Sequence, residues 1–248
     1  MYKILTLIIS IFILFSQINV TLAEEYTEDD FFELEDYGDN DLSLKIDDPF
    51  EQFNRKVFYF NEKADKYFMR PVNKGYRFVA PKFIRTGIGN FLHNLSRPLD
   101  VANSLLQGDI SNARDSFSYF LINSTIGIFG LFDIAKSKEI TFKKKSFGST
   151  LAHYNMSSGP YLVLPFLGPS NVRNFSGFLV ERVIDPLSVN GLKIGGGGNI
   201  LSDSNIYKLT TIRVINKYDE VSDLLEDARN NSFDLYASMR AAYLQFQN

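Results

Sequence analysis

Apolar residues recur at intervals of three and four along most of this chain, and this spacing constrains the fold more than any other feature. The first run consists of Phe50, Phe53, Val57, Phe60, Ala64 and Tyr67. Positions three and four apart lie on one face of an α-helix. Asp48 suits the N-cap, Pro49 suits the first helical turn, and Glu51 stands three residues after the cap. Arg70-Pro71 predicts the end of this helix, because a residue before proline avoids helical geometry.

The same period returns in further segments, which proline, glycine and small polar residues separate. Their apolar positions are Ile84, Ile88, Phe91, Leu92 and Leu95 after Pro81; Val101, Leu105 and Leu106 after Pro98; Ile110, Ala113, Phe117, Phe120 and Leu121 after Asp109; and Val172, Phe175, Leu179 and Val183 before Asp185-Pro186. Ser170 suits the cap of the last of these helices. Two long helical stretches follow, at about 203–229 and 233–246, with Ser232 as the cap of the second. We therefore predict an all-α chain, least regular at 147–170 and with a flexible joint at Gly195–Gly198.

The first 23 residues have the pattern of a secretory signal. Lys3 precedes a largely apolar stretch at 4–15, and small residues ending at Ala23 precede two glutamates. A membrane-crossing helix needs about 20 apolar residues, so this stretch is short for one. We expect cleavage after Ala23. An uncleaved N-terminal anchor is the alternative, because the polar residues 16–19 only mildly interrupt a longer apolar segment.

Charge divides the remaining chain into two parts. Residues 24–48 hold twelve Asp or Glu against one Lys, a net charge of −11, whereas residues 49–248 hold seventeen against twenty-four Lys or Arg, a net charge of +7. So acidic a segment with few apolar residues is typical of a solvated tail, and an electrostatic lid over the basic body is the alternative. The basic body favours anionic lipid headgroups as partners, and export argues against nucleic acid.

An apolar segment beside a lysine-rich strip suggests a membrane interface. Glycine is too frequent in the segment 127–132 for a confident helix, and five lysines follow it between 136 and 145. The membrane-interface candidates are Phe129, Leu131, Phe132, Lys143, Lys144 and Lys145. A buried turn followed by a solvated loop is the alternative interpretation.

No pattern of catalytic or metal-binding residues is evident. The chain has no Cys, and its two histidines, His93 and His153, stand sixty residues apart. We therefore predict no metal, no cofactor and no catalytic residue. The glycines at 195–198 lack the lysine and Ser or Thr of a phosphate-binding loop. A lipid hydrolase using Ser149 and His153 stays open as an alternative, although Ser149 lacks the glycine spacing of a nucleophile elbow.

Four short motifs follow one another in order: DPFEQFNR at 48–55, LLQGD at 105–109, FGSTL at 147–151 and GPYLVLPFLGPS at 159–170. In this order they resemble the MlaA/VacJ family, over residues 48–190, with a weaker match at 240–245. The resemblance divides the chain into a signal peptide at 1–23, an acidic segment at 24–47 and a lipid-transport domain at 48–248.

The resemblance implies a single ring-like helical domain with Gly/Pro-rich connections, embedded in the periplasmic leaflet of the outer membrane. Family members remove mislocalised phospholipid from the outer leaflet through an amphipathic channel, without enzymatic chemistry, and pass it to a periplasmic carrier. They associate with trimeric outer-membrane porins. This chain departs from the family in lacking the cysteine that is lipidated after the signal, so we expect anchoring at the outer membrane without lipidation. A surface protein involved in intercellular spread is a further alternative.

The resemblance also implies functional residues. Candidates for the lipid path or headgroup contacts are Asn54, Asn61, Arg173, Arg182 and Asp185, and Asn54 and Asn61 suit helix contacts equally well. Ordinary surface charge is the alternative for the other three. Candidates for gating and porin contact are Phe147, Asn155, Ser157, Gly159 and Tyr161. Relatives often have glycine where this chain has Asn155 and Ser157, so we expect a stiffer hinge here.

Overall fold

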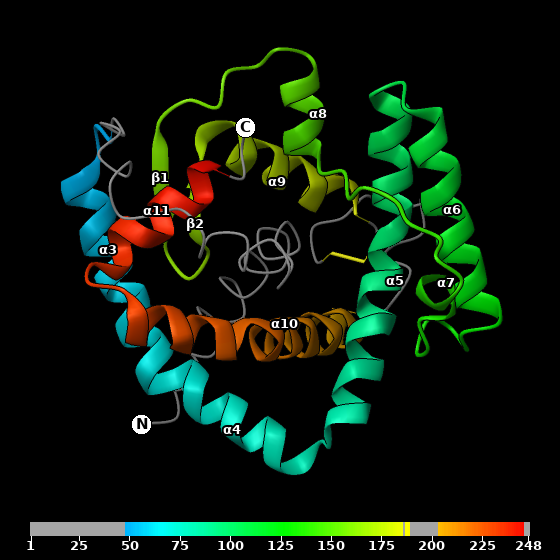
Figure 1. Ribbon diagram of the computed structural model, residues 1–248, viewed down its shortest axis with the longest axis horizontal. Helices are drawn as coiled ribbons and strands as arrows, with labels where there is room; N and C mark the ends of the chain where they lie inside the picture. The colour runs from blue at the N-terminus through cyan, green and yellow to red at the C-terminus, as the bar shows by residue number, and fades with distance from the viewer. Residues whose placement is uncertain (1–47, 186, 189–202, 246–248) are drawn as a thin grey trace.

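A computed structural model describes residues 48–185, 187–188 and 203–245. The predicted signal peptide, acidic segment and glycine joint lie outside these residues. Helices arranged in a closed circuit make up the described fold, with one short β-hairpin between them (Figure 1). We call this circuit the frame; it consists of residues 51–106 and 147–184. The mostly helical fold class predicted from the sequence is confirmed.

One side of the frame is a continuous helical rod formed by α3 (Glu51–Ala64), η3 (Asp65–Met69) and α4 (Arg70–Val79). The prediction that the helix ends at Arg70-Pro71 is wrong. A π-helical turn, η3, precedes the proline, and the Arg70 N–H donates to the Asp65 carbonyl five residues earlier. Pro71 then stands in the first turn of α4, directly after the π-helical turn, which accommodates the residue without an N–H inside the continuous rod.

The adjoining side of the frame is α5 (Lys82–Leu106), against which α6 (Ile110–Thr125) packs from outside (Figure 1). The prediction of two helices separated at Pro98 is wrong, because α5 continues through this proline. Proline removes one hydrogen bond from a helix interior. The extensive packing of α5 against α6 compensates for that loss. The one-turn helix α7 (Ile134–Ser137) follows α6.

The frame closes through α8 (Phe147–His153), the strands β1 (Tyr161–Leu164) and β2 (Gly168–Asn171), and α9 (Val172–Ile184). The two strands pair antiparallel, with Tyr161 opposite Asn171, and form the one sheet of the described residues. The prediction for this Gly/Pro-rich segment, at 147–170, was the least regular structure of the chain, without strands. The cap of α9 is Asn171, whose side chain accepts the Asn174 N–H at 2.8 Å, so the prediction of Ser170 is one residue early.

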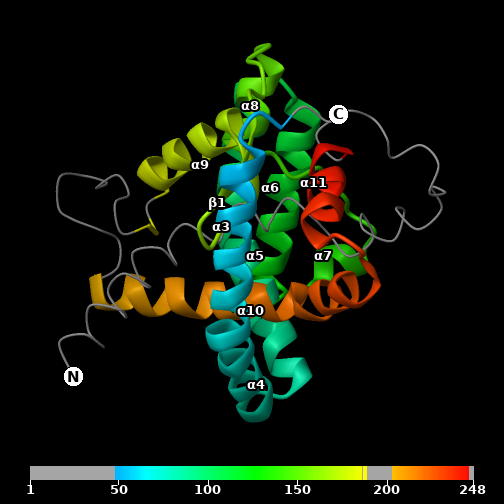
Figure 2. The same cartoon turned by 90° about the vertical axis from the view of Figure 1, so that its left-hand side faces the viewer.

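A long helix, α10 (Asp203–Asn231), crosses the frame from α5 towards α3, and α11 (Leu235–Gln245) returns beside the hairpin (Figures 1 and 2). Both agree with the two predicted C-terminal stretches. The cap of α11 is Asp234, which accepts the Ala237 N–H at 3.2 Å, so the prediction of Ser232 is wrong. At the other end of the domain, Phe50 is the N-cap of α3, and the buried Asp48 carboxylate accepts the Phe50 N–H at 3.2 Å.

Apolar and polar side chains are distributed in the opposite way to a water-soluble domain. Among the described residues, twelve apolar residues are buried, against twenty-three polar or charged ones, and twenty-nine large apolar residues are exposed. The predicted stripe on α3 faces outward at Phe53 and Phe60, whereas Asn54 is fully buried. On α9, Leu179 and Val183 face outward, and inward positions include Glu181. Most members of the predicted stripes therefore point away from the interior, whereas Leu92 and Ala113 are buried.

Candidate functional site

Two asparagines of α3 bind the hairpin to the frame. The Asn54 amide accepts the Val163 N–H at 2.8 Å and donates to the Tyr161 carbonyl at 3.1 Å. Seven residues further on, Asn61 accepts the Phe166 N–H at 2.7 Å and donates to the Leu164 carbonyl at 2.9 Å. Seven residues are about two helical turns, so both amides lie on one face and satisfy the free edge of β1. These hydrogen bonds fit the alternative in which Asn54 and Asn61 hold structural contacts of the first helix, rather than line a lipid path.

A small charged hollow lies between α5, α8, α9 and α10, which we call the arginine pocket. It has a volume of about 80 Å³. Its cations are Arg97, Lys144, Lys145, Arg182 and Arg213, and its carboxylates are Asp100, Glu181 and Asp185. The lining therefore carries a net charge of +2. Within it, the Arg97 guanidinium donates to Asp100 at 2.7 Å and lies 4.5 Å from the centre of the Phe142 ring.

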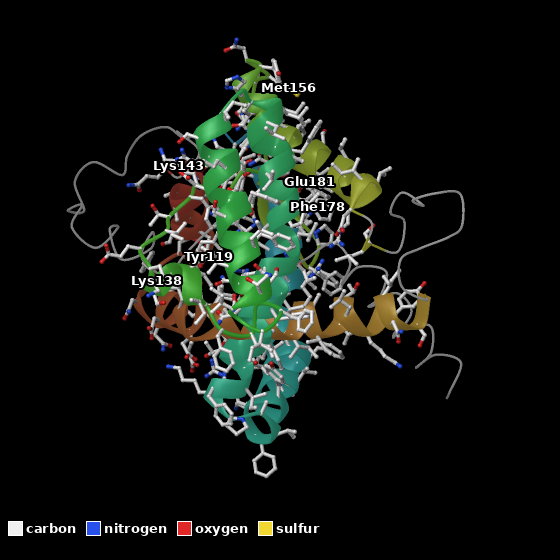
Figure 3. All side chains as sticks on the ribbon, turned by 90° about the vertical axis from the view of Figure 1, so that its right-hand side faces the viewer. Tyr119, Lys138, Lys143, Met156, Phe178 and Glu181 are labelled. Atoms are coloured by element: carbon white, nitrogen blue, oxygen red, sulfur yellow. The ribbon has the colours of Figure 1, made fainter. Side chains whose placement is uncertain are left out.

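Glu181 links three sides of the pocket. Its carboxylate accepts from the Asn103 amide of α5 at 3.2 Å and from the Phe147 N–H at the start of α8. Figure 3 shows Glu181 and Phe178 on the α9 side of α5, with Lys138 and Lys143 beyond α6. Helices α8 and α9 approach closely here, because a Cβ at Gly177 would lie 2.7 Å from the Gly148 Cα. The two glycines thus permit the backbone contact that positions Glu181.

The pocket continues into a hydrogen-bonded cluster on α10. His93 Nε2 lies 3.2 Å from both carboxylate oxygens of Glu220, and Lys217 Nζ lies 3.4 Å from one of them. Burial raises the pKa of Glu220, but His93 and Lys217 outweigh it and lower the pKa below its ordinary range. Glu220 is therefore a carboxylate at neutral pH, and its contact with His93 joins α10 to α5 by a hydrogen bond.

Ser149 lines the arginine pocket, but its hydroxyl is engaged with neighbouring groups. It donates to the Ser146 carbonyl at 2.7 Å and accepts from the Gln107 amide at 3.1 Å. His153 stands four residues later with an exposed ring against Tyr154. Among the described residues, the Ser149 hydroxyl bonds only to a backbone carbonyl and an amide, and no group of His, Asp or Glu side chains is arranged to hold a metal ion. The local geometry is that of a helix N-terminus rather than an activated nucleophile.

The structure separates the other predicted residues. Arg182 and Asp185 line the arginine pocket together with Lys144 and Lys145. Arg173 lies elsewhere, because its side chain donates to the Met156 carbonyl at 3.2 Å. This contact joins the start of α9 to the loop after α8.

The predicted gating segment contains residues of very different burial. Asn155 and Gly159 have φ angles of 61° and 69°, in the left-handed region that Asn and Gly adopt most readily. Ser157 is exposed, whereas Tyr161 is buried in a cluster with Tyr236 and Tyr243. Phe147 is half-buried at the start of α8. Asn155 thus adopts the left-handed backbone conformation that glycine favours, so this position does not require glycine.

The predicted membrane-interface residues lie outside the frame. Phe129 is 74% exposed at the turn after α6, and Leu131 and Phe132 are also exposed. Lys143 and Lys144 are exposed, whereas Lys145 is half-buried. None of the described helices combines the length and hydropathy of a membrane-crossing helix.

Sequence reasoning missed the principal buried cations of the pocket, Arg97 and Arg213, and their neighbour Asp100. A signal was present, because Asn94, Arg97 and Asp100 recur at three-residue spacing on the face of α5 opposite its apolar stripe. Once the apolar stripe is known to face outward, this row of polar residues predicts a polar face towards the interior.

Comparison with known proteins gives two kinds of relative. An uncharacterized protein of Rickettsia prowazekii is 34% identical over 218 residues, covering 88% of this chain and 83% of that protein. The intermembrane phospholipid transport system lipoprotein MlaA of Escherichia coli is 36% identical over 145 residues, covering 57% of this chain and 58% of the lipoprotein. The similarity to the lipoprotein thus spans little more than half of each chain.

A solved structure also matches, from work on how bacterial outer-membrane lipid asymmetry is maintained. It has a TM-score of 0.64 and 30% sequence identity, and the match covers 80% of this chain and 96% of that one. The family model described as MlaA lipoprotein matches residues 46–248. The chain therefore belongs to the MlaA family.

Proposed function

We propose that this protein transports phospholipid as part of a system that maintains outer-membrane lipid asymmetry. In this proposal it takes mislocalised phospholipid from the outer leaflet through the interior of the frame and delivers it to a soluble periplasmic carrier. The E. coli relative is named as a component of intermembrane phospholipid transport, and the matching structure concerns lipid asymmetry.

The observation that carries the proposal is the inverted distribution of side chains. Twenty-nine large apolar residues are exposed on the described part of the chain, and they form outward stripes on successive helices. A soluble monomer rarely exposes contiguous apolar patches beyond about 300–600 Å². Lipid tails are a suitable environment for these stripes, while the polar interior suits a charged headgroup.

A shielded path is necessary for any such transfer. A phospholipid has about 30 methylenes, and exposing each to water costs about 0.8 kcal/mol, roughly 24 kcal/mol in all. Thermal fluctuation does not supply this free energy. A protein that keeps the tails in an apolar environment and the headgroup among polar groups removes most of the barrier. Because the sequence contains no recognisable nucleotide-binding motif, we infer that transfer is passive. Its direction is then set by the affinity of the acceptor protein for phospholipid.

The proposal includes three finer features. The frame sits in the periplasmic leaflet, its gating segment at 147–163 contacts a trimeric porin, and the apolar exterior retains the protein without a lipid anchor. Exposed aromatic residues support the last feature, with Phe78 91% exposed in the last turn of α4. High-salt washing of membranes tests it, since release of the protein into the soluble fraction would contradict apolar retention.

The deciding experiment measures phospholipid in the outer leaflet of bacteria with and without the gene, by palmitoyl transfer onto lipopolysaccharide. Transport predicts a rise on deletion, which the wild-type gene corrects. The Ser149→Ala variant separates transport from lipid hydrolysis, because a hydrolase would lose its nucleophile whereas a conduit still lowers the outer-leaflet phospholipid. No rise on deletion, or no correction by Ser149→Ala despite normal protein levels, would overturn the transport proposal.

A further inference from the structure

We propose that the arginine pocket binds the phosphodiester of a glycerophospholipid headgroup, with Arg213 and Arg97 as the principal donors. This inference rests on the proposed function and deepens it, because it assigns the group that the transported lipid presents to named side chains inside the frame.

The two arginines carry buried donors that no described residue satisfies. Arg97 is 6% exposed and Arg213 is 7% exposed, and both line the pocket. Among the described residues, neither Nε–H has a hydrogen-bond acceptor. Buried donors without partners destabilise a fold, so native proteins rarely retain them without a ligand, water or ion. The Nε atoms themselves are covered, but both guanidinium groups line the hollow and bring two buried positive charges to it.

Neighbouring groups hold both guanidinium groups in place. Arg97 is fixed by its hydrogen bond to Asp100 and by the Phe142 ring. The nearest atoms of Arg213 and Asp185 are 3.8 Å apart, which is an ion pair but is longer than a hydrogen bond. Asp185 therefore keeps the Arg213 charge near the pocket while leaving hydrogen-bond capacity for a stronger acceptor.

The carboxylates of the pocket are already engaged. Asp100 and Glu181 each accept hydrogen bonds from two protein donors, and Asp185 accepts the Leu187 N–H at 2.8 Å. Five cations against these three carboxylates give the lining a charge of +2, which the ion pair of Lys145 with Asp109 outside the lining, at 3.8 Å, partly offsets. An anion that enters is therefore attracted by the excess charge and meets donors that the carboxylates do not occupy.

Size and geometry favour a phosphate group. The pocket volume is about 80 Å³, whereas one water needs only about 10–15 Å³ on the same kind of measure. The hollow thus has room for several heavy atoms. A planar guanidinium presents a fork of N–H donors that matches two oxygens of a phosphate, and such charge-assisted pairs are among the strongest hydrogen bonds in proteins.

The proposed function favours a lipid phosphodiester over free phosphate as the bound anion, because the transported molecule carries this group through the interior of the frame.

Calorimetric titration of the purified full chain in detergent tests the assignment with three probes. They are dihexanoylphosphatidylglycerol, dihexanoylglycerol without phosphate, and inorganic phosphate. The proposal predicts that the phospholipid binds most tightly, that inorganic phosphate binds weakly at the same site, and that dihexanoylglycerol loses most of the affinity. Equal binding with and without phosphate, or binding of inorganic phosphate alone, would overturn the proposal.

Two arginines of the same helix provide a matched pair of variants. Arg213→Gln should weaken phospholipid binding by about tenfold or more, because it removes a charge-assisted donor. Arg229→Gln changes an arginine of similar side-chain burial, 14% against 8%, that is fully paired with Glu62 and Asp65 outside the pocket. It should lower the unfolding temperature and leave the affinity unchanged.

Thermal unfolding, measured with and without phospholipid, distinguishes a binding role of Arg213 from a merely structural one. The proposal predicts that Arg213→Gln lowers the unfolding temperature less than Arg229→Gln does, and that phospholipid no longer raises it. A loss of stability as large as that of Arg229→Gln, with unchanged phospholipid affinity, would overturn it. Failure of this inference is distinct from failure of the proposed function, because Arg213→Gln would then still correct outer-leaflet phospholipid in cells.

Discussion

Replacing Asn54 by alanine should release the hairpin from the frame and destabilise the whole domain. The side chain of Asn54 is fully buried and pairs with the Val163 N–H and the Tyr161 carbonyl. Alanine leaves both backbone groups buried without partners, at about 1–3 kcal/mol each, or about 2–6 kcal/mol in total. Typical domains have about 5–15 kcal/mol of unfolding free energy, so the loss is a large fraction of the whole.

Denaturant unfolding in detergent, followed by circular dichroism, measures this loss, and amide hydrogen exchange at Val163 localises it. The Asn61→Ala variant is the matched control, because it removes an equivalent pair of hydrogen bonds two turns away at a half-buried position. Water replaces its bonds more easily, so its effect should be smaller. A change below about 0.5 kcal/mol for Asn54→Ala, which is usual for surface substitutions, would refute the reasoning.

Three further predictions concern packing, charge and pH. Gly177→Ala places a Cβ 2.7 Å from the Gly148 Cα and should lower the unfolding free energy by about 1–3 kcal/mol or more, measured by thermal melting. An unfolding temperature equal to that of the wild type would contradict this prediction. Asp219→Asn weakens the carboxylate that Arg77 and Arg85 share and should cost about 3–5 kcal/mol in the same assay. Asp223→Asn, at a 71% exposed side chain, is its control and should change little. The hydrogen bond from Arg55 lowers the pKa of Asp234, so this pair stabilises the fold above the ordinary carboxyl range and the benefit is lost as pH falls through the lowered pKa. Asp234→Asn should therefore narrow the difference in unfolding temperature between about pH 7 and pH 3; an unchanged difference would count against the pair.

The helical stripes were predictable from the sequence, but their direction was not. Spacing alone places Phe53 and Phe60 on one helical face, and the structure confirms that face. The same spacing arises whether apolar residues meet a protein core or a lipid phase, because periodicity reports which residues share an environment and not what that environment is. The apolar segment at 127–132 with its lysine strip and the family resemblance, rather than the helical spacing, indicated a membrane.

The predicted helix boundaries are wrong where tertiary contacts outweigh local sequence preference. Pro98 continues α5 because neighbouring helices hold it, and the π-turn before Pro71 accommodates a residue that normally ends a helix. Ser170 was a reasonable cap, but its neighbour Asn171 is equally suited, and local sequence does not choose between two adjacent polar residues.

The candidate site was predicted only in part. Arg182 and Asp185 were expected to contact a headgroup and do lie in one pocket, whereas Arg173 lies outside it. Arg97 and Arg213 come from helices more than a hundred residues apart in sequence. Their proximity depends on how α10 crosses the frame, which no local pattern encodes.

The central claim is that the outward apolar stripes face lipid, and cysteine accessibility in intact membranes tests it most directly. Because the chain has no native Cys, single cysteines can replace Phe53, Phe117 and Leu179 on three outward faces, with Asp223, an exposed polar residue of α10, as the control. The account predicts that a water-soluble maleimide labels the control rapidly in membranes and labels the three outward cysteines only after denaturation. Rapid labelling of all four in intact membranes would contradict it.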